Sequence, residues 1–172
     1  MLQIRRATDA ARWADFEAMR DGAPGRARDV ARFVPSGARV LDLGAGTMAL
    51  RNELQPASDY TPADLLAWDR ATQVVDLNQG QFPTGEFDIT IASAVLEFLH
   101  DPPTLLRRLC AAAPRLVLTY PTVEVQPNRR REFGYFNDYT SRVLAAHTEA
   151  AGWRLDDRIE NANGVVFSLR RA

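Results

Sequence analysis

The segment Val40–Leu50, VLDLGAGTMAL, carries the residues whose types and spacing are most informative about chemistry. Asp42 stands two positions before a Gly-x-Gly turn, Gly44 and Gly46, which follows a short apolar run. Glycines here let the backbone pass close to a ligand, because no Cβ holds the ligand away. Asp64 lies 18 residues after Gly46, at the end of the next apolar run. A carboxylate there accepts hydrogen bonds from ribose hydroxyls, so the pattern predicts a nucleoside-containing cofactor.

Asp42 distinguishes between two kinds of cofactor. The run from Gly44 to Ala49 also satisfies the dinucleotide pattern G-x-G-x-x-G/A. A pyrophosphate over the turn would be repelled by an adjacent carboxylate, whereas S-adenosylmethionine carries an ammonium and a sulfonium that a carboxylate attracts. A nicotinamide-dependent oxidoreductase or epimerase therefore stays the alternative, disfavoured also because a chain without lysine has no Tyr-x-x-x-Lys dyad. A non-catalytic module that binds S-adenosylmethionine is a third hypothesis.

The elements that must position these residues follow from the apolar periodicity, which changes several times along the chain. Short apolar runs predict buried parallel strands separated by helical stretches, and a final pair of runs around Asn161–Asn163 predicts a β-hairpin. We expect an α/β fold: a Rossmann-like, doubly wound, seven-stranded sheet, mostly parallel with a C-terminal antiparallel hairpin strand, and helices on both faces. The expected strands are 38–43, 59–63, 73–76, 87–92, 115–119, 153–159 and 164–169, and the expected helices are 9–20, 26–34, 101–113 and 137–151.

With these motifs in order, the chain resembles the class I S-adenosylmethionine-dependent methyltransferases, as a small member without a large inserted lid. The first motif of that family, D/E-x-G-x-G-x-G, is matched except at Met48, where the family usually has its third glycine. FDITIASAVLEFLHD, Phe87–Asp101, is similar to the fourth-strand motif of the family and the helix after it, and AAGW, Ala150–Trp153, to its last helix. The resemblance covers Ala38–Ala172.

The resemblance implies S-adenosylmethionine as cofactor and a set of residues around it. Asp64 matches the acid that binds the ribose, Asp76 begins the motif on the adenine side, and Ser93 stands where the backbone contacts the amino group of the cofactor. Met48 either lines the methionine end or crowds it. The implied cofactor-binding residues are Asp42, Gly44, Ala45, Gly46, Met48, Asp64, Leu65, Asp76, Leu77, Asn78, Ser93 and Ala94.

The acceptor is predicted to be a small molecule bound by the long irregular segment Thr119–Thr140. If its arginines act, the acceptor is anionic; otherwise they form a solvated charge run. Methyl transfer needs positioning first and a base only for a poorly ionised acceptor. Similarity of 60–83 to methyltransferases of glycan pathways makes a saccharide or glycan precursor the first hypothesis. Candidate substrate-binding residues are Tyr120, Arg129, Arg130, Arg131, Tyr135 and Asn137, and candidate bases, in no order, are Glu97, His100, Glu124 and Asp138.

Composition narrows the class of protein. The 172 residues, 46 % hydrophobic and 25 % charged, predict one globular domain, with covering helices in 1–34 and the core in 38–172. The net charge of −1 argues against nucleic acid as substrate, and the longest apolar run, 89–96, is too short to cross a membrane. The single cysteine, Cys110, excludes an internal disulfide, and no metal-ligand spacing is present. We therefore expect a cytoplasmic monomer or homodimer without a metal.

Overall fold

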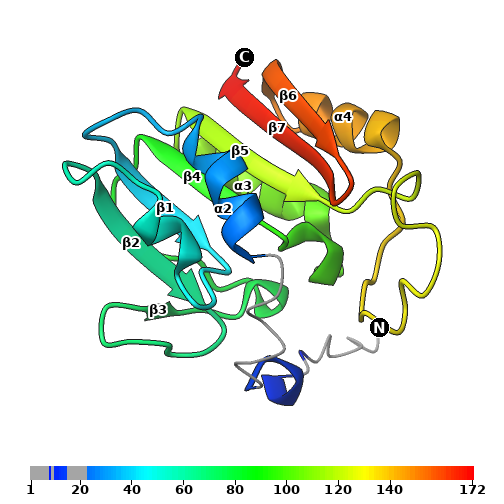
Figure 1. Cartoon of the computed structure of the whole chain (residues 1–172), viewed down its shortest axis with the longest axis horizontal. Helices are drawn as coiled ribbons and strands as arrows, with labels where there is room; N and C mark the ends of the chain where they lie inside the picture. Colours follow the sequence, from blue (N-terminus) through cyan, green and yellow to red (C-terminus); the bar gives the residue numbers. More distant parts are fainter. Residues whose placement is uncertain (1–7, 9, 15–22) are drawn as a thin grey trace.

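A computed structural model describes residue 8, residues 10–14 and residues 23–172 (Figure 1). Its strands are β1 (Arg39–Leu43), β2 (Asp59–Asp64), β3 (Gln73–Val74), β4 (Ile89–Ser93), β5 (Arg115–Tyr120), β6 (Trp153–Asn161) and β7 (Gly164–Arg171). The α-helices of the described part are α2 (Ala23–Ala31), α3 (Pro102–Ala112) and α4 (Ser141–Ala150). Short 3-10 helices are η1 (Ala10–Ala14), η2 (Ala49–Asn52), η3 (Leu77–Gln79) and η4 (Leu96–Phe98).

The strands form one seven-stranded sheet in the order β3-β2-β1-β4-β5-β7-β6. β1 pairs in parallel with β2 and β4, and β4 pairs in parallel with β5. β7 runs antiparallel to both β5 and β6, so it lies between them as the returning strand of the C-terminal hairpin. The predicted sheet, with its antiparallel end, is confirmed.

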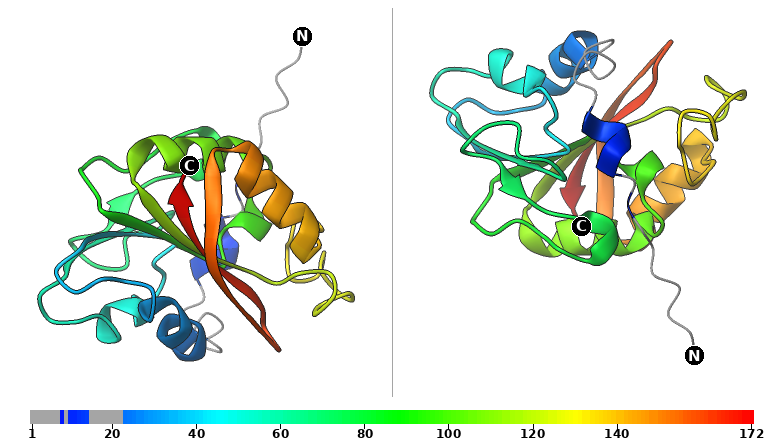
Figure 2. Two further views of the ribbon diagram at one scale, coloured as in Figure 1. Left: turned by 90° about the horizontal axis from the view of Figure 1, so that it is seen from above. Right: turned by 90° about the horizontal axis from the view of Figure 1, so that it is seen from below.

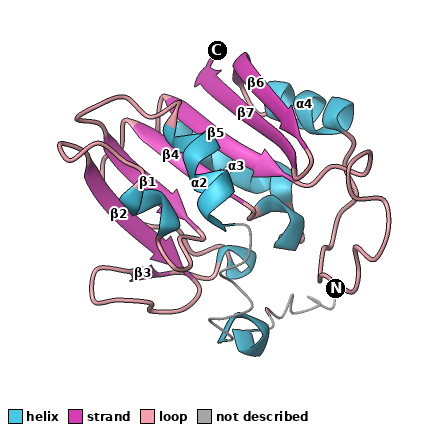
Figure 3. Cartoon of the chain, viewed as in Figure 1, coloured by secondary structure: helices cyan, strands magenta, loops and turns pink. Residues whose placement is uncertain are grey.

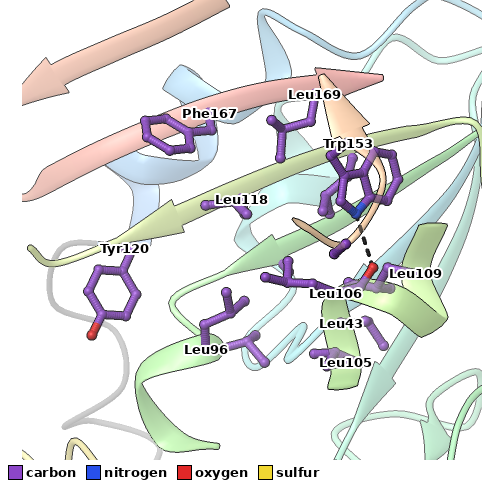
Figure 4. Packing of buried hydrophobic residues seen from close by; sticks show 14 of the residues in the cluster. Leu43, Leu96, Leu105, Leu106, Leu109, Leu118, Tyr120, Trp153, Phe167 and Leu169 are labelled. Atoms are coloured by element: carbon purple, nitrogen blue, oxygen red, sulfur yellow. Dashed lines mark hydrogen bonds between the residues drawn. The ribbon is translucent and has the colours of Figure 1, made fainter. Parts of the chain in front are cut away.

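Alternating side chains of the sheet build two cores, one on each face. Leu41 and Leu118 point into the larger core under α3 and α4, whereas Val40 and Val117 point into the smaller one under α2 and η2. Figure 2 shows these helices on opposite sides of the sheet. In the larger core the Trp153 indole donates a hydrogen bond of 3.0 Å to the Leu106 carbonyl oxygen, which satisfies its one buried donor (Figure 4).

The sequence predicted helical stretches between the first four strands. That prediction is wrong, because these connections are not α-helical. Loops, turns and the short helices η2 and η3 connect β1 to β4 (Figure 3). After the glycine turn, Met48 takes a left-handed backbone conformation with φ 56°, so an α-helix cannot start before it, and Pro56 follows soon after. Two carboxylates, Asp69 and Asp76, accept hydrogen bonds from the backbone that follows them and stabilise turns in place of helices.

Helix boundaries were predicted well where a cap precedes the helix. Asp101 accepts a hydrogen bond from the Thr104 N–H and begins α3 as expected, while Thr140 caps α4, which starts four residues later than the predicted 137. α2 begins at Ala23, before the predicted start at 26. The proline in this segment was read as the end of the preceding helix, but proline is favoured in the first turn of a helix. Of the helix predicted at 9–20, 10–14 forms η1, and 9 and 15–20 lie outside the described residues.

The left-handed backbone at Met48 yields the first prediction. Replacing Met48 by Gly should give a protein about 1 kcal/mol more stable than replacing it by Ala, because both variants lose the same side-chain packing and only glycine adopts φ 56° without strain. Urea unfolding of the two variants measures this difference. A Gly variant less stable than the Ala variant would contradict it.

Candidate active site

A cavity of about 880 Å³ opens at the carboxyl ends of the parallel strands. Side chains at or near the ends of β1, β2, β4 and β5 line it, namely Asp42, Asp64, Ser93 and Thr119. Open α/β sheets bind ligands at this edge, where the connections diverge from the sheet. The sheet therefore presents a ligand-sized cavity to the loops that carry the sequence motifs.

The cavity brings together the cofactor-binding residues that the sequence predicts, with one exception. Met48 is not among the lining residues, although its neighbours Thr47 and Ala49 are. The expectation that the Met48 side chain lines or crowds the cofactor therefore gains no support from the cavity wall and stays a prediction. The predicted residues that line the cavity are Asp42, Gly44, Ala45, Gly46, Asp64, Leu65, Asp76, Leu77, Asn78, Ser93 and Ala94.

The glycine turn is held by the end of β2. The Gly44 N–H donates to the Ala63 carbonyl oxygen at 2.8 Å, and the Gly46 N–H donates to Asp64 Oδ2 at 2.8 Å. Asp64 Oδ1 accepts a longer bond of 3.2 Å from the Leu66 N–H. A carboxylate oxygen accepts two hydrogen bonds, so Asp64 keeps lone pairs for a ligand while it fixes the turn.

Gly44 is required by packing as well as by its backbone conformation. Its φ is +67°, and a Cβ at this position would lie 2.6 Å from Cγ2 of Val95. Any side chain would displace Val95, which lines the cavity from the segment after β4. The first glycine of the motif therefore allows the turn after β1 to lie close to the segment after β4.

A second set of hydrogen bonds holds Asp76 and Asn78 in place. Asp76 Oδ1 accepts a hydrogen bond of 2.9 Å from the hydroxyl of Thr8, which also lines the cavity. Asn78 Nδ2 donates to the Phe98 carbonyl oxygen at 3.1 Å, and Asn78 Oδ1 accepts from the His100 N–H at 3.0 Å. The loop after β3 and the loop after β4 are therefore joined beside the cavity.

Two buried carboxyl groups in the cavity wall have raised pKa values. Burial raises the pKa of Asp42 to about 7; the hydrogen bond from the Tyr60 hydroxyl, at 2.6 Å, opposes this shift and the nearby charge of Asp64 adds to it. Burial likewise raises the pKa of Glu97 to about 7, although the positive charges of Arg26 and Arg130 lower it. Glu97 is 1 % exposed, and its Oε2 has no hydrogen-bond partner in the described part of the chain. A buried polar atom without a partner at a cavity wall indicates a place for a ligand group.

The other three candidate bases, His100, Glu124 and Asp138, are not among the residues that line the cavity, and they stay predictions from the sequence. The His100 ring stacks on Phe136 with centroids 4.2 Å apart, and neither ring belongs to the cavity wall. Glu124 is exposed and accepts from the Ser141 N–H at the start of α4. Asp138 forms ion pairs with Arg130 and Arg131. Burial raises the pKa of Asp138, but the hydrogen bonds from the two arginines outweigh it and hold the pKa below the usual value.

Arg130 has a structural role that the sequence did not indicate. Its guanidinium is 6 % exposed and donates to the Tyr120 hydroxyl at 3.0 Å, to the carbonyl oxygens of Pro121, Gln126 and Asn137, and to Asp138 Oδ1 at 2.7 Å. The expectation that Arg130 meets an acceptor is therefore corrected, because its donors are used inside the protein.

The remaining candidate substrate-binding residues divide between this network and the cavity. Tyr120 and Asn137 are bonded to each other at 2.6 Å and lie outside the cavity wall, as do Arg129 and Arg131, whose ion pairs are with Glu132 and Asp138. Tyr135 alone of the six candidates lines the cavity.

Several lining residues were missed by sequence reasoning. They come from residues 8 and 13, from α2, from η4, from the β5–α4 loop and from the turn between β6 and β7. Only η4 and the β5–α4 loop belong to segments that the sequence analysis singled out. Only the fold brings these segments to one edge of the sheet. The missed residues include Thr8, Trp13, Arg26, Phe98, Gln126, Phe133 and Asn163.

Two further classes of site were searched for in the described residues. Within 8, 10–14 and 23–172 no group of three or more His, Cys, Asp or Glu side chains is placed to hold a metal ion. In the same part of the chain no helix has the length and apolarity needed to span a membrane.

The Arg130 network yields a prediction on stability. Arg130→Ala should lower the free energy of unfolding by on the order of 3 kcal/mol, because it leaves several buried acceptors without a donor. Arg129→Ala is the matched control: its ion pair with Glu132 joins two exposed side chains, so we expect a loss below about 0.5 kcal/mol. Urea denaturation of the two variants tests this, and equal stability would show that the buried contacts of Arg130 contribute nothing.

Comparison with solved structures reveals the same fold in several proteins. A Haloferax volcanii complex between the Trm112 methyltransferase activator and a provisionally assigned methyltransferase matches with a TM-score of 0.75 and 13 % identity, over 95 % of each chain. The mitomycin 7-O-methyltransferase MmcR matches with a TM-score of 0.68 and 21 % identity, over 95 % of this chain. The N-terminal domain of EvdMO1, solved in the presence of S-adenosylhomocysteine and D-fucose, gives 0.58 and 16 %, over 88 % of this chain and 83 % of that one.

At these identities the likeness shows the fold, and this chain spans only 58 % of the length of MmcR. No curated protein matches the sequence. A family model described as a methyltransferase domain, however, matches residues 16–164, which is most of the chain. This match sets aside the nicotinamide-dependent alternative. The chain belongs to the methyltransferase domain family and is an S-adenosylmethionine-dependent methyltransferase.

Proposed function

We propose that this methyltransferase transfers the methyl group to an oxygen atom of a small molecule, and that Glu97 takes the proton of that oxygen. The observation that carries the proposal is the buried Glu97 carboxyl. It lies in the wall of the same cavity as the predicted cofactor residues, and one of its oxygens has no partner among the residues that the structure describes. A group of that kind is costly for the fold unless a ligand uses it.

The residues around the cavity fit S-adenosylmethionine. Asp64 has lone pairs to accept from the ribose hydroxyls, and Asp42 supplies a carboxylate for the cationic methionine part. Asp76, Leu77 and Asn78 would border the adenine, with Ser93 and Ala94 beside it. When bound, the cofactor supplies a sulfonium methyl group: an acceptor lone pair forms the new bond to carbon while the electrons of the carbon–sulfur bond return to sulfur.

Glu97 suits the proton transfer that accompanies this displacement. A general base is most effective when its pKa lies near the working pH, and burial brings the pKa of Glu97 to about 7. The charges of Arg26 and Arg130 keep it from rising further. The acceptor proton would pass to Glu97 Oε2 and then to solvent after the product leaves.

Two lines of evidence support a small acceptor that is methylated at an oxygen atom. One structural neighbour is named a 7-O-methyltransferase, and side chains of the β5–α4 loop border the same cavity as the predicted cofactor residues. Another neighbour was solved in the presence of D-fucose, so the saccharide acceptor that the sequence suggested is a second class of small molecule to test. A monomer or homodimer remains the prediction for the assembly, and the Trm112 complex adds an activator protein as a second kind of partner to look for.

Asp42 should make cofactor binding depend on pH. In the free protein its raised pKa keeps it protonated below about pH 7, so binding of the cation there must first release a proton. The affinity for S-adenosylmethionine should therefore fall as pH decreases below 7, by at most about tenfold per unit. Calorimetric titrations at pH 6 and pH 8 measure this change.

Two variants assign the effect to a residue. Asp42→Asn should bind more weakly at pH 8 and lose much of the difference between the two pH values, whereas Glu97→Gln should keep that difference. An unchanged pH dependence in Asp42→Asn would place the cationic end of the cofactor elsewhere.

Glu97→Gln tests the proposed base. The amide keeps the size of the side chain but accepts no proton, so kcat should fall by about 10²- to 10⁴-fold while the affinity for S-adenosylhomocysteine stays within about twofold. In the parent protein kcat should rise with pH up to about 7, as Glu97 ionises, and this limb should be absent in the variant.

The assay is transfer of a labelled methyl group to a panel of phenols, carboxylic acids and methyl glycosides. Glu124→Gln, which changes an exposed carboxylate outside the cavity, is the matched control and should keep the parent rate. A Glu97→Gln variant with full activity would exclude Glu97 as the base, and labelling of protein or RNA alone would exclude a small acceptor.

A further inference from the structure

Four aromatic side chains gather in the wall of the cavity. Trp13 and Phe98 meet edge to face with centroids 4.5 Å apart, and Phe98 and Tyr135 do so at 5.3 Å. Phe133 continues the row, 5.9 Å from Tyr135. All four line the cavity, and we call them the aromatic wall.

Three separate segments supply the aromatic wall, which is therefore a product of the tertiary fold. Trp13 comes from η1, Phe98 from η4, and Tyr135 and Phe133 from the β5–α4 loop. Phe133 is 40 % exposed, and the other three rings are partly buried, so the row remains accessible to a ligand. Large apolar rings at an opening lose water when a flat ligand covers them, which favours binding.

The aromatic wall lies next to the proposed base. Phe98 directly follows Glu97 in η4, and the N–H of Phe136, one residue after Tyr135, donates to the Glu97 carbonyl oxygen at 2.7 Å. Glu97, Phe98 and Tyr135 all line the same cavity, so a ligand that rests on the two rings shares that cavity with the Glu97 carboxyl. The Tyr135 hydroxyl is engaged with Gln126 Oε1 at 3.4 Å, so this residue contributes its ring.

On these observations we propose that the acceptor is a flat aromatic compound bearing a hydroxyl group, with its ring on the aromatic wall and its hydroxyl at Glu97. This inference rests on the proposed function and names the class of its substrate. In the reaction the phenolic oxygen forms the bond to the methyl carbon, its proton goes to Glu97, and the electron pair of the broken carbon–sulfur bond goes to sulfur. The products are an aryl methyl ether and S-adenosylhomocysteine.

The acidity of the hydroxyl group separates this acceptor from a saccharide. A phenol such as the tyrosine side chain has a pKa of about 10, whereas an aliphatic hydroxyl is nearly as weak an acid as water, at about 15.7. A carboxylate with a pKa of about 7 is therefore a far better matched base for a phenol. A saccharide would also bury several hydroxyls, each costing about 1–3 kcal/mol if it found no partner along the rings.

Binding of three probes to the protein saturated with S-adenosylhomocysteine tests the proposal. The probes are 2-naphthol, its saturated analogue decahydro-2-naphthol and methyl β-D-glucopyranoside. We expect 2-naphthol to bind at least about tenfold more tightly than either of the others, since stacking adds to the burial of area. Equal affinity for the saturated analogue, or tighter binding of the glucoside, would overturn the proposal.

Substitutions in the aromatic wall test whether its rings cause the tighter binding of 2-naphthol. Phe98→Leu and Phe133→Leu should each weaken 2-naphthol about three- to tenfold and leave the affinity for S-adenosylhomocysteine within about twofold. Phe82→Leu is the matched control, because Phe82 packs under Arg108 outside the cavity and should change neither affinity. Phe133 is exposed enough that its variant should fold even if Phe98→Leu does not.

The outcomes separate this inference from the proposed function. If the Phe98 and Phe133 variants weaken S-adenosylhomocysteine as much as 2-naphthol, the wall serves the cofactor and the inference fails. Labelled-methyl transfer to methyl glycosides but not to phenols would overturn the aromatic acceptor and leave small-molecule methylation intact. Transfer to neither class, with S-adenosylhomocysteine still bound, would overturn both.

Discussion

The hydrogen bond from the Gly46 N–H to the Asp64 carboxylate, 2.8 Å long, is the contact on which the cavity depends. Together with the bond from Gly44 to Ala63, it fixes the turn after β1 to the end of β2. Loops and short 3-10 helices connect these strands, so the turn takes its position mainly from these bonds and from the contact of Gly44 with Val95. The same carboxylate that orders the turn is the one proposed to hold the ribose.

A second network positions the acceptor side. The buried Arg130 gathers the two ends of the β5–α4 loop, and Asn137 Nδ2 then donates to the carbonyl oxygens of Leu96 and Leu99, on either side of Glu97. The loop that carries Tyr135 therefore also holds the turn that carries the proposed base. This arrangement explains how the β5–α4 loop keeps a buried carboxyl and the aromatic wall beside one cavity. Its cost is the burial of Arg130 and Glu97, which their surroundings only partly offset.

Local signals in the sequence were sufficient to predict the sheet. Apolar runs predicted every strand, and the acid-glycine pattern with Asp64 identified residues that do line one cavity. Local signals failed where a side chain serves a distant segment. The run of three arginines contains one buried residue, Arg130, and two exposed ones, and the spacing does not distinguish them. Trp13 and Arg26 lie far from the motifs in the sequence and line the cavity only because of the tertiary fold. The helix expected after the turn is absent because Met48 adopts a conformation that its residue type disfavours.

The central claim is that one cavity holds the cofactor against Asp64 and leaves Glu97 facing the acceptor. A crystal structure of the protein with S-adenosylhomocysteine tests it most directly. We predict both ribose hydroxyls within hydrogen-bond distance of the Asp64 carboxylate, about 2.6–3.2 Å, with the sulfur atom and Glu97 bordering the same unfilled space beside Phe98 and Tyr135. A ribose bound away from Asp64, or a Glu97 carboxyl separated from the sulfur by the body of the cofactor, would contradict the account.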